Sequence, residues 1–189
     1  MIPSSITPNL ETVAMPMTIL GIDPDTKNLH VVESGSNSPQ SSFYTHTIPM
    51  PSAVHKERCG FAFRGLGELL FNLTERDGKP PLIYLEEPVQ GPGGPGGTIP
   101  QVYIHGAVMT AADEYNCKLV QVNNKTWKKR ECGNGNIKKE DIPSVLEEKW
   151  PELYKVVHGQ QDLVDAGFIY LFGRHHYNLV TRLKKKAGK

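Results

Sequence analysis

Four carboxylates stand where side chains from distant parts of the chain can meet. Asp23 ends a short apolar run, Glu86 ends another, and Asp162 and Asp165 are three residues apart in a segment with helical spacing. Side chains three apart share one side of a helix. Oxygen ligands of this kind suit Mg²⁺, and two such ions activate water and stabilise the leaving oxygen of a phosphodiester. Each acidic residue taken alone also fits a helix cap or strand end, so the prediction of a metal site depends on their combination.

Basic side chains are concentrated in two short segments, although the net charge of the whole chain is only +1. Residues 125–139 carry six basic and one acidic side chain, and residues 174–189 carry six basic and none. Such asymmetry favours an anionic partner, usually nucleic acid. The alternative is a solvated loop followed by a frayed tail. The candidate DNA-binding residues of the first segment are Lys125, Lys128, Lys129, Arg130, Lys138 and Lys139.

The 189 residues suffice for one domain, and no apolar run is long enough to span a membrane. Three scattered cysteines give neither a disulfide framework nor the ligand spacing of a zinc site, which indicates a reducing, intracellular compartment. We expect a disordered extension without a signal peptide over residues 1–16, one domain over residues 17–180, and a basic tail over residues 181–189.

The elements that must position the acidic residues follow from hydrophobic periodicity. Strands are predicted at residues 18–23, 30–33, 42–48, 82–86 and 118–122, and helices at residues 53–76, 99–115, 138–150 and 160–177. The Gly/Pro run at 91–97 is predicted to be a loop. Short connections make the first three strands an antiparallel meander, and alternating strands and helices follow. This order predicts an α/β domain with a mixed five-stranded sheet flanked by helices, as in the ribonuclease H-like fold and in the first half of actin-like ATPases.

Four motifs, in this order, resemble those of RuvC-type Holliday junction resolvases, with the chain as a divergent member. They are Leu20-Gly-Ile-Asp-Pro24, Tyr84-Leu-Glu-Glu87, Trp127-Lys-Lys129 with Gly133-Asn-Gly-Asn-Ile-Lys-Lys-Glu-Asp-Ile142, and Asp162-Leu-Val-Asp-Ala166. The resemblance departs at Asp25, where the family usually has glycine. Asp25 is interpreted as a turn residue or a further ligand. The Gly/Pro run replaces an aromatic wedge that some members carry.

The resemblance implies a homodimeric, Mg²⁺- or Mn²⁺-dependent endonuclease that binds branched DNA. It would resolve four-way junctions by paired cuts that leave 5′-phosphate and 3′-hydroxyl ends. The four carboxylates fall on the catalytic metal ligands, Lys128 falls on a DNA-contacting residue, and Lys139 falls on a catalytic basic residue near the scissile phosphate. Glu87 is the alternative to Glu86, because successive strand side chains point to opposite faces. The expected location is the cytoplasm, with a phage or virus as a suggested source.

Three other functions remain open from the sequence. A broader nuclease for flaps and other branched DNA would use the same carboxylates. A junction-binding module would keep the fold without cleaving. An actin-like ATPase is the least favoured, because the chain is too short for two lobes and lacks a second glycine-rich phosphate loop.

Overall fold

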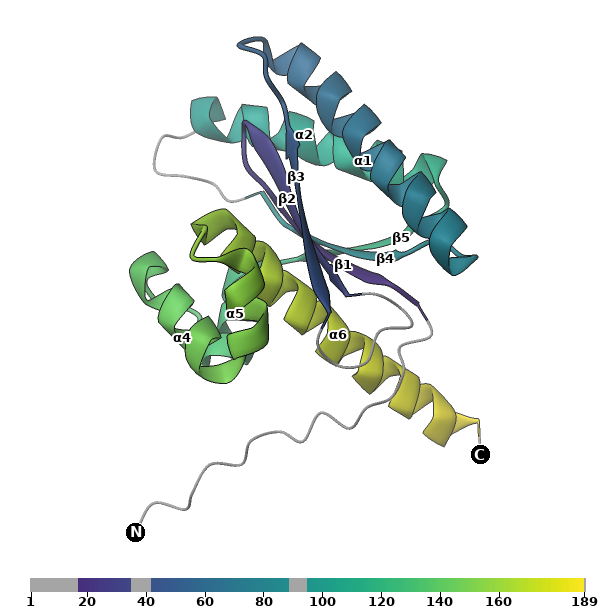
Figure 1. Cartoon of the computed structure of the whole chain (residues 1–189), viewed down its shortest axis with the longest axis vertical. Coiled ribbons are helices and arrows are strands. Elements are labelled where there is room, and N and C mark those ends of the chain that lie inside the picture. Colours follow the sequence, from purple (N-terminus) through teal and green to yellow (C-terminus); the bar gives the residue numbers. More distant parts are fainter. Residues whose placement is uncertain (1–16, 35–41, 89–94, 189) are drawn as a thin grey trace.

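The centre of the molecule is one five-stranded sheet with the order β3-β2-β1-β4-β5 (Figure 1). The computed structural model describes residues 17–34, 42–88 and 95–188. Strand β1 pairs antiparallel with β2 and parallel with β4, β2 pairs antiparallel with β3, and β4 pairs parallel with β5. The predicted mixed sheet is therefore confirmed. The strands are β1 (Ile19–Pro24), β2 (Asn28–Ser34), β3 (Phe43–Pro49), β4 (Leu82–Glu86) and β5 (Lys118–Val122).

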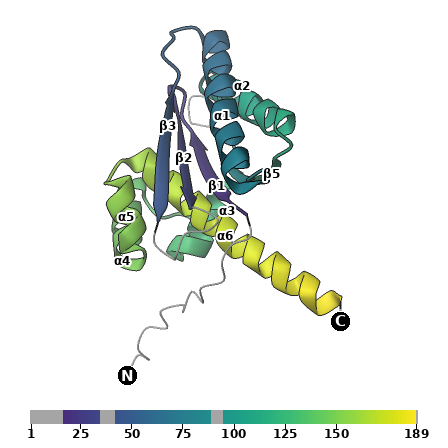
Figure 2. The ribbon, with the colours of Figure 1, turned by 45° about the vertical axis from the view of Figure 1, so that its right-hand side comes forward.

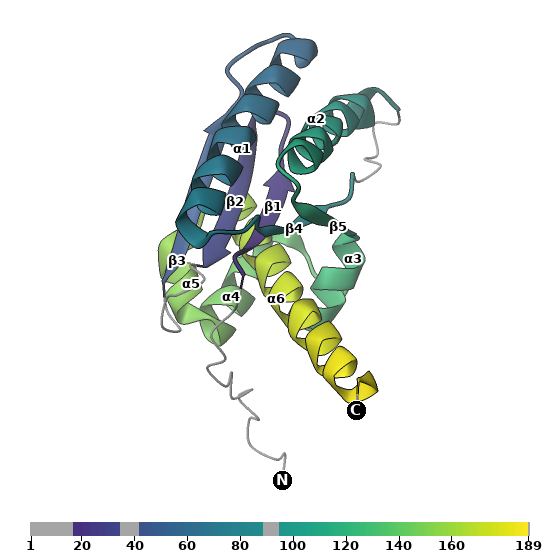
Figure 3. The ribbon, with the colours of Figure 1, turned by 90° about the vertical axis from the view of Figure 1, so that its right-hand side faces the viewer.

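Helices cover both faces of this sheet (Figures 2 and 3). One face carries α1 (His55–Asp77) and α2 (Pro95–Glu114). The other face carries α4 (Ile142–Lys149), α5 (Pro151–Val157) and the long α6 (Gln161–Ala187). The short helix α3 (Asn124–Trp127), the π-helical turn η1 (Lys128–Cys132) and the 3₁₀ turn η2 (Lys139–Asp141) connect β5 to α4.

The alternation of side chains along the strands divides the interior into two cores. In β1, Leu20 and Ile22 belong to the core under α1 and α2, while Ile19 belongs to the core under α6. In β4, Ile83 belongs to the core under α1 and α2, while Tyr84 belongs to the core under α6. Because successive strand residues point to opposite faces, every second residue after Ile19 and Tyr84 points toward α6. This pattern decides which acidic side chains can meet.

Helix α6 lies directly on β1 because Gly21 has no side chain. A β-carbon at Gly21 would overlap the backbone of α6 at Ala166 and Tyr170. A second close approach is at Gly173, where a β-carbon would overlap the ring of Tyr84. The first turns of α6 are thereby held against the carboxyl ends of β1 and β4.

Three predicted helices differ clearly from the structure in their bounds. Helix α2 begins at Pro95, inside the run predicted to be a loop, because proline is tolerated in a first helical turn; residues 91–94 lie outside the described residues. The helix predicted over residues 138–150 ends at Lys149, and α5 starts separately at Pro151, because a residue before proline disfavours helical geometry.

The third difference is at the carboxyl end. Helix α6 continues to Ala187 instead of ending near residue 177, so most of the predicted basic tail is helical. Residues 178–187 contain neither glycine nor proline, and Lys184, Lys185 and Lys186 lie in the last turn, where cations interact favourably with the helix dipole. The predicted extension over residues 1–16 and the turn between β2 and β3 lie outside the described residues, apart from the turn's first residue, Ser34.

Candidate active site

The predicted carboxylates meet at the carboxyl ends of β1 and β4, beneath the start of α6. Asp23 lies two residues after Gly21, and Glu86 lies two residues after Tyr84, so both point to the α6 face. The parallel register pairs Ile22 with Leu85, which places Asp23 and Glu86 at the next position on neighbouring strands. Their carboxyl groups interact directly.

Helix α6 contributes the other two acidic residues from its first two turns. Oxygen atoms of Asp23, Asp162 and Asp165 all lie within 4.8 Å of one another. The side chain of Asp165 is buried and accepts a hydrogen bond from Gln161 Nε2 at 3.2 Å. Asp162 is more open, with 41% of its side chain exposed. The described residues thus bring all four predicted ligands together.

Two donors that sequence reasoning did not assign to the site hold Glu86 in place. Its Oε1 atom accepts hydrogen bonds from Asn124 Nδ2 at 2.6 Å and from Trp127 Nε1 at 2.9 Å. Glu86 is buried, Trp127 is fully buried, and the indole stacks on Phe168 with ring centroids 5.6 Å apart. No spacing in the sequence indicates where the indole N–H points.

Burial and mutual repulsion make this cluster costly when all of its members are charged. Burial raises the pKa of Asp23 well above its ordinary value, and the neighbouring carboxylates, Glu86 first, raise it further. Burial also raises the pKa of Asp165 to about 6, against the opposing effect of Lys139. Negative charges held this close together favour protonation of a carboxylate or binding of a cation. This donor set of clustered carboxylate oxygens fits a hard divalent ion.

Lys139 is the predicted basic residue that touches the acidic cluster. Its Nζ atom lies 3.3 Å from Asp162 Oδ1 and 3.8 Å from Asp165 Oδ2. Burial acts to lower the pKa of Lys139, but the two carboxylates outweigh it and raise the pKa. An ammonium group that stays charged therefore lies beside the two carboxylates of α6.

The remaining predicted DNA-binding cations make other contacts or are exposed. Lys128 lies over the Trp127 ring, 5.3 Å from its centroid, and its charge acts to lower the pKa of Asp165. Arg130 pairs with Glu131 at 3.4 Å. Lys138 Nζ is 4.0 Å from Glu140. Lys125 and Lys129 are exposed.

The structure places the two alternative carboxylates, Glu87 and Asp25, differently with respect to the acidic cluster. Glu87 points away from the cluster, as alternation requires, and its Oε2 atom accepts a hydrogen bond from Asn123 Nδ2 at 3.0 Å. Asp25 lies in the turn after β1, where its backbone N–H donates to the carbonyl of Asn28 at 3.0 Å. Asp25 also belongs to a second group of closely spaced polar atoms.

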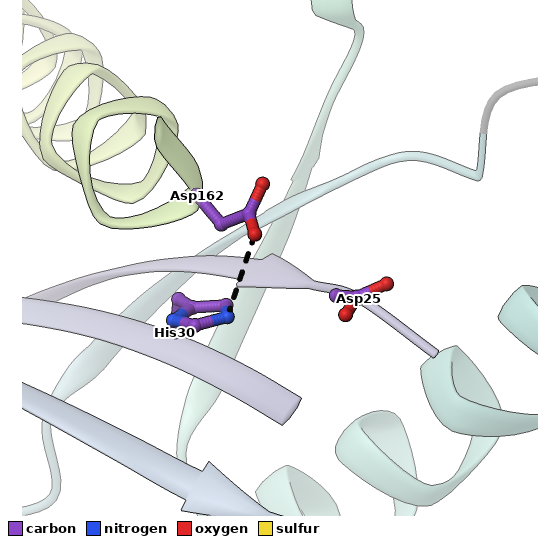
Figure 4. Close-up of side chains that lie close together, drawn as sticks. All are labelled: Asp25, His30 and Asp162. Atoms are coloured by element: carbon purple, nitrogen blue, oxygen red, sulfur yellow. Dashed lines mark ion pairs between the residues drawn. The ribbon is translucent and has the colours of Figure 1, made fainter. Parts of the chain in front are cut away.

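That second group contains His30, a residue that was not selected from the sequence. Ligand atoms of Asp25, His30 and Asp162 lie within 4.8 Å of one another (Figure 4). His30 is paired with Asp23 across β1 and β2, and it lies two residues before Val32, which packs in the core under α6. The alternation of β2 was therefore a signal for His30. Burial lowers the pKa of His30, although both aspartates act to raise it.

None of the described helices is long and apolar enough to cross a membrane.

Comparison with known proteins shows the fold. No protein-family model and no curated protein matches the sequence. The chain is similar to the structure of Thermus thermophilus RuvC in complex with Holliday junction substrate, with 21% identity, a TM-score of 0.68, and coverage of 87% of this chain and 97% of that one. A second Thermus thermophilus RuvC structure gives 20% identity, a TM-score of 0.58, and coverage of 82% and 91%.

A third similar structure is the Fowlpox virus resolvase with substrate Holliday junction DNA, at 15% identity and a TM-score of 0.45, covering 85% of this chain and 99% of that one. The two RuvC structures confirm the ribonuclease H-like fold predicted from the sequence. They also confirm, for the fold, the resemblance drawn from the four motifs.

Proposed function

We propose that this chain is a metal-dependent endonuclease that resolves four-way DNA junctions. The observation that carries the proposal is the convergence of Asp23, Glu86, Asp162 and Asp165 under the start of α6. The fold supports the same conclusion, since it is shared with a RuvC whose structure contains a Holliday junction substrate. The proposed ligands of Mg²⁺ or Mn²⁺, with two ions in the site, are these four carboxylates.

The residues of the site divide the work. When bound, the divalent ions supply the Lewis acidity that phosphodiester hydrolysis requires. Asp23 is central, because its carboxyl group interacts with the other three. Asn124 and Trp127 fix the direction of Glu86 through their hydrogen bonds. Fixed ligands keep their geometry when the substrate arrives.

Lys139 serves the proposed reaction as the cation nearest the acidic residues. Its contacts with Asp162 and Asp165 place a positive charge beside the carboxylates, where a DNA phosphate would otherwise be repelled. Lys128 and the exposed cations Lys125 and Lys129 extend this positive charge along α3 and η1. Such groups bind phosphate without reading the base sequence.

The proposed assembly is a homodimer. A two-fold dimer presents two identical sites to a four-way junction, and it would cut two opposed strands to leave 5′-phosphate and 3′-hydroxyl ends that ligase can seal.

The test compares synthetic four-way junctions with matched linear duplex and flap DNA, with Mg²⁺ or with chelator. We expect paired, symmetric nicks on the junction in Mg²⁺ and none in chelator. Asp23→Asn should abolish cleavage while junction binding remains. Asp113→Asn is the matched control, because Asp113 is exposed on α2 on the opposite face of the sheet.

Each other outcome contradicts a defined part of the proposal. Equal cutting of flaps would indicate a broader branched-DNA nuclease. Junction binding without cleavage in either Mg²⁺ or Mn²⁺ would indicate a binding module. Unchanged cleavage by Asp23→Asn would remove the carboxylate cluster from the mechanism.

A further inference from the structure

His30 is a buried histidine whose ring has no hydrogen-bond partner among the described residues. Only 6% of the residue is exposed, and both Nδ1 and Nε2 are buried without a hydrogen bond. Buried polar atoms in proteins are nearly always paired, so an unpaired ring is a feature that calls for a ligand or an ion. The contacts that hold Glu86 do not involve His30.

The ring of His30 faces two carboxylates from different elements (Figure 4). Its Nε2 atom is 3.8 Å from Asp162 Oδ2, which is too long for a hydrogen bond. The other oxygen, Asp162 Oδ1, is the one that contacts Lys139. Asp25 approaches from the turn after β1, where the Thr26 N–H donates to its Oδ1 atom at 2.5 Å. This hydrogen bond orients the Asp25 carboxylate.

We propose that His30, Asp25 and Asp162 form a second cation site, which adjoins the acidic cluster and shares Asp162 with it. The ligand class is a divalent late first-row transition metal such as Zn²⁺. Imidazole nitrogen suits these ions, whereas Mg²⁺ prefers oxygen ligands alone. The site does not require the proposed nuclease activity, because neither Asp23 nor Glu86 belongs to it.

The distances allow such an ion after a small adjustment. Two metal–ligand bonds of about 2.1 Å span at most about 4.2 Å, so the 3.8 Å between His30 Nε2 and Asp162 Oδ2 is already within reach. The three ligand atoms lie within 4.8 Å of one another. Asp162 is 41% exposed in its side chain and has room to turn toward the ring.

Sharing Asp162 links the two sites. Its Oδ1 atom faces Lys139 and its Oδ2 atom faces His30. An ion held by His30 therefore fixes the orientation of a carboxylate that the proposed active site also uses.

The test is a Zn²⁺ titration of the full chain without DNA, in excess Mg²⁺ so that the all-carboxylate cluster is occupied by the hard ion. The readout is the ring ¹⁵N signals of the histidines, with those of His30 assigned by their loss in His30→Gln. We expect the His30 Nε2 signal to shift and to saturate at one equivalent of Zn²⁺. His30→Gln and Asp25→Asn should each weaken Zn²⁺ binding by about tenfold or more.

Two further variants distinguish this site from the acidic cluster and from a histidine on the surface. Asp23→Asn should keep the His30 shift, so failure of the nuclease proposal leaves this test intact. His55→Gln removes an exposed histidine at the start of α1 and should bind Zn²⁺ like the wild type. If no histidine ring signal shifted at one equivalent of Zn²⁺, the proposal would be overturned, even if His30→Gln failed to fold. Equal Zn²⁺ affinity in folded His30→Gln would also overturn it.

Discussion

The hydrogen bond from Trp127 to Glu86 gives a sharp prediction, because the indole N–H can be removed while an aromatic ring is kept. Trp127→Phe deletes a buried 2.9 Å hydrogen bond to a carboxylate. A hydrogen bond to a charged group contributes about 1.5–3 kcal/mol. The smaller ring also leaves a cavity beside Phe168, which costs about 1–2 kcal/mol more. We therefore expect the free energy of unfolding to fall by about 2.5–5 kcal/mol.

Two measurements test the loss of stability and the position of Glu86 separately. Thermal unfolding in chelator reports the total, and for a chain of this size the expected loss lowers Tm by about 10 °C. Calorimetric titration with Mg²⁺ reports the position of Glu86, which loses the Trp127 donor in the variant but keeps the Asn124 donor. Mispositioned ligands weaken metal binding by about tenfold or more.

The matched control is Trp150→Phe. Trp150 is half-buried and packs against the His175 ring, with centroids 6.0 Å apart. The same atoms are removed there, without the bond to Glu86. We expect a smaller loss of stability and unchanged Mg²⁺ affinity. If the Trp127 and Trp150 variants lost equal stability and both bound Mg²⁺ like the wild type, the indole N–H would have no part in positioning Glu86.

The remaining predictions concern the packing and the charges of the site. Gly21→Ala should lower the free energy of unfolding by about 3 kcal/mol or more, because the new β-carbon overlaps the backbone of α6. In the control variant, Gly106→Ala, the new β-carbon meets no atom within 4 Å, and the free energy of unfolding should rise by up to about 1 kcal/mol. Equal urea midpoints for the two variants would refute the close approach at Gly21. Burial raises the pKa of the Asp165 carboxyl group from 3.8 to about 6, so the folded state binds a proton there more tightly than the unfolded state does. In chelator, the free energy of unfolding should therefore fall as pH rises from about 4 to about 6, by at most about 3 kcal/mol. Mg²⁺ should therefore raise Tm more at pH 7.5 than at pH 5 in the wild type; an equal rise at both pH values would contradict this reasoning.

The carboxylate cluster was largely predictable because it depends on short periodicities. Alternation along a strand lets only one of Glu86 and Glu87 face the site, and the structure shows that it is Glu86. A spacing of three places Asp162 and Asp165 on one side of a helix. Their roles as metal ligands remain predictions that the cleavage and titration experiments address.

The structure of the basic segment, residues 125–139, was not predictable from local sequence patterns. The sequence predicted the charge of residues 125–139 but bounded no helix between residues 115 and 138, whereas α3 and the π-helical η1 occupy residues 124–132. These helical turns place Trp127 in the core, where its Nε1–H donates a hydrogen bond to Glu86. The direction of a side chain in so short a helix depends on what packs around it, and no short spacing encodes that direction.

By itself, the sequence determined the mixed sheet, the acidic residues and the face on which they lie, because period-2 and period-3.6 patterns are local properties of the chain. Only the tertiary structure decided what these residues meet. The contact at Gly21 places α6 on β1, and the strand register sets His30 beside Asp23. The first relation joins segments distant in sequence, and the second joins two consecutive strands. Both depend on packing or pairing between segments, which neither segment determines alone.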